Sequence, residues 1–135
     1  TGNNFVRTML RLMRERDEIR VVADQIGTPT YAPTLASAVW SMAGAGIQGI
    51  YHYTDAGVAS WYDFAVAIQE EALVEGLVHK PVPIIPIATE DYPTAARRPA
   101  YSVLNCRGTY ATIGRVAPHW RENLRHMMKE IKVNG

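Results

Sequence analysis

Segments with the periodicity of an amphipathic helix alternate along this chain with short extended runs, and this alternation constrains the fold most. The helical segments are about 4–16, 33–43, 60–75 and 118–131, and the extended runs are 19–23, 49–53 and 82–87. Helices that alternate with strands favour parallel strand pairing. The sequence therefore predicts an α/β fold, a small lobe of helices with a few short, partly parallel strands and no full doubly wound sheet.

Residues that cap helices mark the expected boundaries. Asn3 or Asn4 can cap the first helix, and Ser60 with Asp63 resembles a capping box at the start of the third. Gly76 is expected to end that helix. A further short helix is expected between residues 105 and 114.

Prolines and glycines punctuate the remaining chain. Pro83 and Pro86 place the run 82–87 at a sheet edge or make it irregular. Residues 44–49 read G-x-G-x-x-G, but a helix precedes them and an extended run follows. A dinucleotide fingerprint has the reverse order. We therefore interpret these glycines as a helix stop followed by a tight connection.

The composition excludes several classes of protein. The 135 residues are 47% hydrophobic with a formal net charge of +1, which suits one globular domain and gives no basic surface for nucleic acid. No stretch approaches the roughly 18 apolar residues of a membrane helix, so no membrane partner is expected. The single cysteine, Cys106, makes no internal disulfide and fits a reducing cytoplasm.

Few residues form a recognisable chemical constellation. The four histidines lack metal-ligand spacing, so no metal site is expected. His52, in a predicted strand, is interpreted as a hydrogen-bonded interior residue. Cys106 has no arranged base beside it in the sequence, so a packed thiol is expected rather than a nucleophile. The sequence therefore predicts no catalytic residue.

Two loops carry polar groups suited to a ligand. In residues 24–30, backbone amides, Gln25 and Thr30 can hydrogen-bond a polar molecule. In the proline-stiffened loop 92–99, the adjacent Arg97 and Arg98 suit phosphate oxygens. The same arginines can instead pair with acidic neighbours or a helix end, and the sequence leaves both interpretations open.

A family resemblance lies in these loops and in four further segments. The six segments are 2–10 (GNNFVRTML), 24–30 (DQIGTPT), 49–52 (GIYH), 60–65 (SWYDFA), 92–99 (YPTAARRP) with 102–105 (SVLN), and 118–121 (PHWR). In this order they resemble the C-terminal half of dTDP-4-dehydrorhamnose reductases, which are extended short-chain dehydrogenases/reductases. The likeness covers essentially the whole chain, residues 1–135, as one sugar-nucleotide-binding domain.

The resemblance implies an activity and a division of labour. The family reduces the C4 ketone of dTDP-4-dehydro-L-rhamnose with NADH or NADPH, in dTDP-rhamnose biosynthesis for bacterial polysaccharides. An N-terminal Rossmann part holds the cofactor and the Tyr-x-x-x-Lys pair, and the C-terminal part binds the dTDP-sugar. No Tyr of this chain has Lys four residues later. We therefore expect neither a cofactor site nor activity in this chain alone. Because it begins at Thr1, we interpret it as cut from a longer protein.

The resemblance also implies residue roles. Asn4 and Phe5 are placed beside the nucleotide, and Gln25, Gly27 and Thr30 border the substrate pocket. Arg97 is implied near the diphosphate, with Arg98 as its helper. Trp61, Ser102 and Asn105 are expected to be structural, with Trp61 packing the third helix against the sheet.

The expected partners follow from the same resemblance. They are a dTDP-sugar and the missing Rossmann part, and a homodimer is left open. One alternative is a non-catalytic binding or regulatory module that contacts a partner through an exposed apolar face. Another is a reductase that acts on a different nucleotide-deoxysugar.

Overall fold

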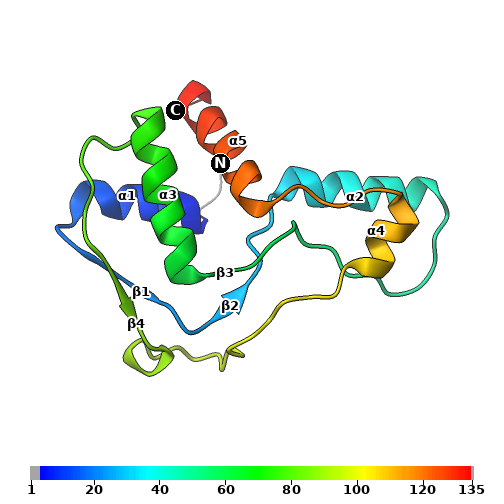
Figure 1. Ribbon diagram of the computed structural model, residues 1–135, viewed down its shortest axis with the longest axis horizontal. Coiled ribbons are helices and arrows are strands. Elements are labelled where there is room, and N and C mark those ends of the chain that lie inside the picture. The colour runs from blue at the N-terminus through cyan, green and yellow to red at the C-terminus, as the bar shows by residue number, and fades with distance from the viewer. Residues whose placement is uncertain (1–3, 135) are drawn as a thin grey trace.

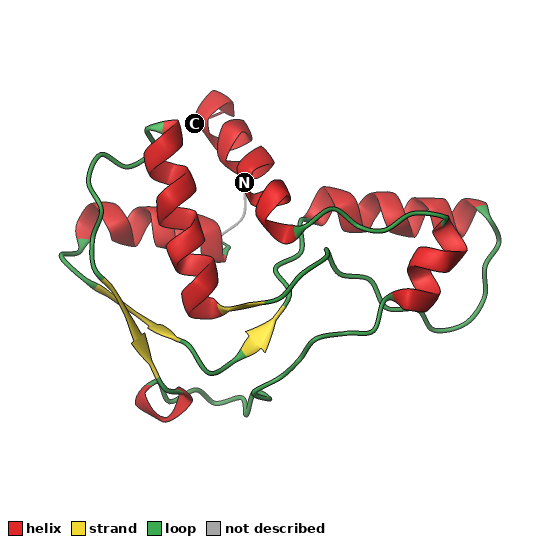
Figure 2. Ribbon diagram, in the orientation of Figure 1, coloured by secondary structure: helices red, strands yellow, loops and turns green. Residues whose placement is uncertain are grey.

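A computed structural model describes residues 4–134 of the chain as an α/β structure in which helices predominate (Figures 1 and 2). In chain order the elements are α1 (Phe5–Glu15), β1 (Ile19–Val22), β2 (Ile26–Gly27), α2 (Ala32–Gly44), β3 (Ala59–Ser60), α3 (Trp61–Glu75), β4 (Ile84–Ile87), the 3₁₀ helix η1 (Thr89–Asp91), α4 (Arg107–Ile113) and α5 (Trp120–Asn134). The expected fold class is confirmed.

Helices α1, α3 and α5 pack together and enclose the hydrophobic core. Met13, Ile68 and Met128, one from each helix, are almost fully buried. Each such side chain stabilises the fold by about 1.5–3 kcal/mol through its removal from water. The helical spacing of apolar residues therefore determines which faces of the three helices meet.

The caps predicted from the sequence begin and end the helices. Asn4 accepts a hydrogen bond from the backbone N–H of Arg7 at 3.0 Å and is the N-cap of α1. The alternative cap, Asn3, lies outside the described residues. Ser60 and Asp63 form the predicted capping box of α3, and Gly76 ends that helix with φ 72°. These boundaries fix where the first residues of α1 and α3 point.

The strands form two small sheets. β1 and β4 pair in parallel, with Ile19 opposite Ile84 and Val22 opposite Ile87, whereas β2 and β3 pair antiparallel. Among residues 4–134, β4 has no strand on its outer side. The prediction that the prolines place this strand at an edge is therefore confirmed.

Helices α2 and α4 lie together to one side of the three-helix core (Figure 1). α2 contains no charged residue, and of its thirteen residues Ala38 alone is buried. Leu35, Val39 and Trp40 are exposed, Trp40 to 84%. A helix that is apolar all round normally packs against other protein, so this helix leaves an uncovered apolar surface on the chain.

The prediction of a strand at residues 49–53 is wrong. The segment forms no strand, Ile50 is 91% exposed and His52 is exposed rather than interior. The Thr109 hydroxyl donates to the His52 carbonyl, and the Tyr110 hydroxyl donates to the Thr54 carbonyl. Hydroxyl groups of α4 thus bind the carbonyls of residues 52 and 54, and within residues 4–134 no strand pairs with this segment. The glycines before it do end α2 as expected.

Candidate functional site

A cavity of about 620 Å³ opens between the first turns of α1 and α3, α5, and the loops at residues 25–32 and 98–102. That volume is within the usual range for small-molecule sites. Six of the seven residues implied by the resemblance line it: Asn4, Phe5, Gln25, Gly27, Thr30 and Arg98. Segments far apart in the sequence therefore converge on one concave surface.

The wall formed by residues 25–31 is fixed by hydrogen bonds to segments distant in the sequence. Ile26 donates to the Ala100 carbonyl and accepts from the backbone N–H of Ser102, both at 2.8 Å. The Thr28 hydroxyl donates to the Gly57 carbonyl at 2.9 Å. A Cβ on Gly27 would lie 3.0 Å from the Ser102 hydroxyl oxygen, so glycine permits this close approach.

Gln25 stands at the outer end of this wall. Its side-chain amide donates to the Thr89 hydroxyl at 3.1 Å, and that hydroxyl donates to the Asp24 carboxylate at 2.7 Å. The Asp24 carboxylate also accepts from the backbone N–H of Thr89, which is the largest of the interactions that lower its pKa. The beginning of the wall is thereby tied to η1.

Aromatic side chains form the opposite wall. The rings of Phe5 and Trp61 have centroids 4.9 Å apart, Phe5 stacks on Phe64 at 5.5 Å, and Phe64 meets Trp120 edge to face. Trp61 is 39% exposed and lines the cavity, so it contacts α1 there instead of packing α3 against the sheet as predicted. As the first residue of α3 it points toward the start of α1. Aromatic faces of this kind suit a flat ring.

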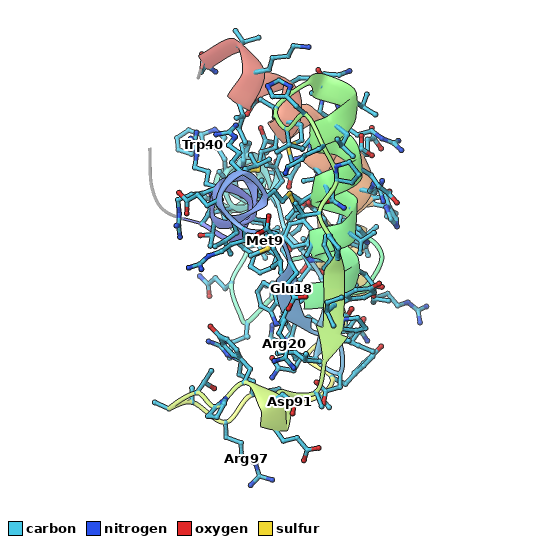
Figure 3. The ribbon with its side chains drawn as sticks, turned by 90° about the vertical axis from the view of Figure 1, so that its left-hand side faces the viewer. Met9, Glu18, Arg20, Trp40, Asp91 and Arg97 are labelled. Atoms are coloured by element: carbon cyan, nitrogen blue, oxygen red, sulfur yellow. The ribbon has the colours of Figure 1, made fainter. Side chains whose placement is uncertain are left out.

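The two adjacent arginines are placed differently. Arg98 lines the cavity and Arg97 does not. Figure 3 shows Arg97 pointing away from the body of the molecule. Successive side chains of an extended segment point to opposite sides, so only one of the pair can face the site. Neither arginine belongs to an ion pair within residues 4–134, and the alternative of pairing with Glu90 or Asp91 is not seen there.

A buried carboxylate that the sequence did not single out lines the cavity. Asp55 is 2% exposed and accepts hydrogen bonds from the Tyr31 backbone N–H, the Thr34 hydroxyl and the Asn123 side-chain amide. The Tyr31 hydroxyl donates to Glu130, and burial together with this bond raises the pKa of Tyr31 to about 12. The start of α2 is thus joined to α5 twice, through the Asp55 carboxylate and through the Tyr31–Glu130 hydrogen bond.

Ion pairs hold α5 against α3. The Glu71 carboxylate, on a residue only 8% exposed, accepts from the guanidinium groups of Arg121 at 2.9 Å and Arg125 at 3.0 Å. Burial raises the pKa of Glu71, but the hydrogen bonds from the two arginines outweigh it and the pKa is lowered. Glu71 does not line the cavity. It positions the helix that supplies Trp120 and Asn123.

Other chemical groups stand apart from the cavity. Cys106 is buried, as the packed-thiol interpretation expects, and its sulfur lies 3.4 Å from the Thr54 hydroxyl. Within residues 4–134, no group of three or more His, Cys, Asp or Glu side chains is placed to hold a metal ion. None of the described helices is both long and apolar enough to span a membrane.

The family model described as the RmlD substrate binding domain matches residues 1–133. The chain belongs to this family. Named relatives with similar sequences include a dTDP-4-dehydrorhamnose reductase of Aggregatibacter actinomycetemcomitans, 44% identical over 93% of this chain. Another is the spore coat polysaccharide biosynthesis protein SpsK of Bacillus subtilis, 45% identical over 96% of this chain. The resemblance inferred from the sequence is therefore confirmed.

Solved structures of this family have the same fold. A dTDP-4-dehydrorhamnose reductase from Clostridium acetobutylicum superposes with a TM-score of 0.88 at 39% identity, over 97% of this chain and 45% of that one. One from Bacillus anthracis, in complex with NADP, gives 0.86 at 38% identity, over 96% of this chain and 44% of that one. This chain also spans 45% of the Aggregatibacter reductase and 43% of SpsK. It thus corresponds to less than half the length of these relatives.

Proposed function

We propose that this chain is the dTDP-sugar-binding part of a dTDP-4-dehydrorhamnose reductase. The observation that carries this proposal is the convergence of six resemblance-derived residues on one cavity of about 620 Å³. The family match and the names of the relatives agree with it. In the complete reductase, the chain would bind dTDP-4-dehydro-L-rhamnose for reduction to dTDP-L-rhamnose.

The lining of the cavity suits the parts of a nucleoside diphosphate. The exposed face of Trp61 beside Phe5 offers an apolar surface for a base. The Arg98 guanidinium can donate two hydrogen bonds to phosphate oxygens. The start of α1, at Asn4, adds backbone N–H groups and the positive end of a helix dipole. Binding energy from these remote groups orients the sugar for reaction.

The glycine motif at residues 44, 46 and 49 does not fit a dinucleotide cofactor. Gly44 is the last residue of α2, and Gly46 and Gly49 follow it, whereas a fingerprint opens a helix whose N-terminus faces the pyrophosphate. We propose that NADH or NADPH binds to a Rossmann part outside this chain, as does the group that protonates the ketone oxygen. The chain alone is then inactive, and its contribution to the reaction is substrate affinity and orientation.

A calorimetric titration of the purified protein with dTDP tests the proposal. Arg98→Ala removes a charged donor from the cavity and should weaken binding by roughly 10- to 100-fold, since such bonds contribute about 1.5–3 kcal/mol. Arg97→Ala is the matched control, because it removes the same charge from the neighbouring residue outside the cavity. Equal losses in the two variants, or no dTDP binding by the unmodified protein, would contradict the proposal. Tighter binding of another nucleotide would favour a reductase of a different deoxysugar.

A second candidate function is a non-catalytic binding module, favoured by the uncovered face of α2. Leu35, Val39 and Trp40 expose apolar surface on a helix without charged residues. Exposed apolar patches of this kind often mark interaction sites. A stoichiometric protein partner, found together with a failure to bind dTDP, would support this candidate over the first.

A further inference from the structure

We propose that Asp55 is the positioning residue of the cavity, whose buried carboxylate holds the wall at residues 28–31 against α5 in the geometry that binds the nucleotide. This inference rests on the proposed function for the identity of the ligand. Asp55 would act through the wall and not by touching phosphate. No residue beside it in the sequence suggests this role, because all three donors to its side chain come from distant segments.

The three hydrogen bonds bring three parts of the chain together at one carboxylate. The Tyr31 backbone N–H, at the N-cap of α2, donates at 2.9 Å, and the Thr34 hydroxyl, in the first turn of α2, donates at 2.6 Å. The Asn123 amide donates at 2.7 Å from α5. Asp55, Tyr31 and Asn123 also line the cavity, so the carboxylate joins two of its walls directly.

Asp55 supplies from another segment the cap that α2 lacks. Tyr31, at the N-cap position, makes no side-chain capping bond. The first N–H groups of a helix need acceptors, and a negative charge there is favoured by the helix dipole. A buried carboxylate in turn needs several donors, because losing one leaves an unsatisfied charge. The start of α2, residue 55 and α5 are therefore held in a single relative position.

Glu71 provides the comparison that separates positioning from general stability. It too is a buried carboxylate, and it also holds α5, through Arg121 and Arg125. It does not line the cavity and does not contact the wall at residues 28–31. Removing either carboxylate loosens α5, but only the loss of Asp55 also removes a hydrogen bond to the wall, the one from the Tyr31 backbone N–H.

The asparagine variant separates the geometry of the acceptor from its charge. In Asp55→Asn, the remaining oxygen can accept from Tyr31 and Asn123, which already share one carboxylate oxygen. The new amide group can donate to the Thr34 hydroxyl, which lies 2.7 Å from the Tyr31 carbonyl and can donate there instead. All partners stay satisfied, so asparagine should restore most of what alanine loses.

The test combines dTDP titration with amide hydrogen exchange on the purified protein and its variants, well below every unfolding midpoint. Asp55→Ala should weaken dTDP binding about tenfold or more, since small displacements of binding groups have large effects. It should also speed exchange of the Tyr31 amide at least tenfold. Asp55→Asn should recover affinity to within about threefold of the original protein. Glu71→Ala should lower Tm, leave exchange of the Tyr31 amide unchanged, and weaken dTDP binding less than Asp55→Ala does.

Each contrary result has a distinct meaning. The inference is overturned if Asp55→Ala binds dTDP normally, if asparagine fails to restore binding, or if Glu71→Ala weakens binding as much. If Asp55→Ala does not fold, Asn123→Ala replaces it in the binding measurement, because it removes the donor on α5. It should weaken dTDP binding while the Tyr31 amide, still bonded to Asp55, exchanges at its original rate, and normal binding by this variant overturns the inference. If the unmodified protein does not bind dTDP, the proposed function fails. The exchange rate of the Tyr31 amide then decides by itself whether Asp55 holds the wall.

Discussion

Replacing Gly57 by alanine measures how closely the segment before β3 packs on the start of α5. Gly57 has φ +89°, and a Cβ there would lie 2.4 Å from Nε2 of His119 and 2.9 Å from Cδ1 of Trp120. His119 is exposed and its ring can rotate, whereas Trp120 is buried and cannot. The alanine methyl group therefore meets one neighbour that yields and one that does not.

The expected loss of stability has two parts. A left-handed backbone costs a residue with a Cβ roughly 1–2 kcal/mol. Overpacking in a filled site adds about 1–3 kcal/mol. Gly57→Ala should therefore lower the free energy of unfolding by about 2–5 kcal/mol. In a domain of this size, that corresponds to a fall in Tm of roughly 10 °C.

Alanine variants of two other glycines separate the backbone contribution from the packing contribution, in thermal unfolding followed by circular dichroism. Gly114 has φ +69°, and a methyl group added there would have no atom within 4 Å, so Gly114→Ala reports backbone strain alone. Gly108, in the first turn of α4, has neither a positive φ nor a close neighbour, and alanine there should be neutral or slightly stabilising. If Gly57→Ala and Gly114→Ala lose equal stability, the packing argument is refuted.

Two further predictions concern α3. Ser60→Ala removes the capping box with Asp63 and should lower the free energy of unfolding, measured in urea, by about 1 kcal/mol. The control is Ser41→Ala, on the exposed face of α2, which should change this free energy by less than about 0.5 kcal/mol. Because the pKa of Glu71 is lowered from 4.5, the folded protein binds fewer protons than the unfolded chain, and stability should fall as the pH drops below about 4.5. Glu71→Gln should flatten this dependence of the urea midpoint on pH, and an unchanged slope would contradict the assignment.

Local hydrogen-bond chemistry explains which features could be predicted from the sequence. The caps at Asn4, Ser60 and Gly76 are predicted correctly because each depends on residues within one turn. The edge position of β4 follows from the missing N–H of its proline. The pocket residues come from the family resemblance, and the cavity brings six of them together.

Long-range contacts explain what could not be predicted. Residues 49–53 have a strand-like composition, but their partners are side chains of α4 rather than another strand. Asp55 lies next to them as an ordinary acidic residue, and its three donors are 21 to 68 residues away. The choice between Arg97 and Arg98 depends on which way the loop faces, which no local pattern fixes.

The pairing of β1 with β4 also determines in which direction this sheet can grow. The N–H groups of Ile19 and Ala23 donate to the carbonyls of Pro83 and Ile87. Because backbone groups alternate in direction along a strand, the backbone of Pro86 faces away from β1 and the backbone N–H and C=O of Arg20 face away from β4. Proline has no N–H to offer an incoming strand, which closes that side. On the other side, no strand within residues 4–134 covers β1. The exposed charge of Arg20 there disfavours a second copy of β1 as a neighbour and leaves the position open to a strand of different charge.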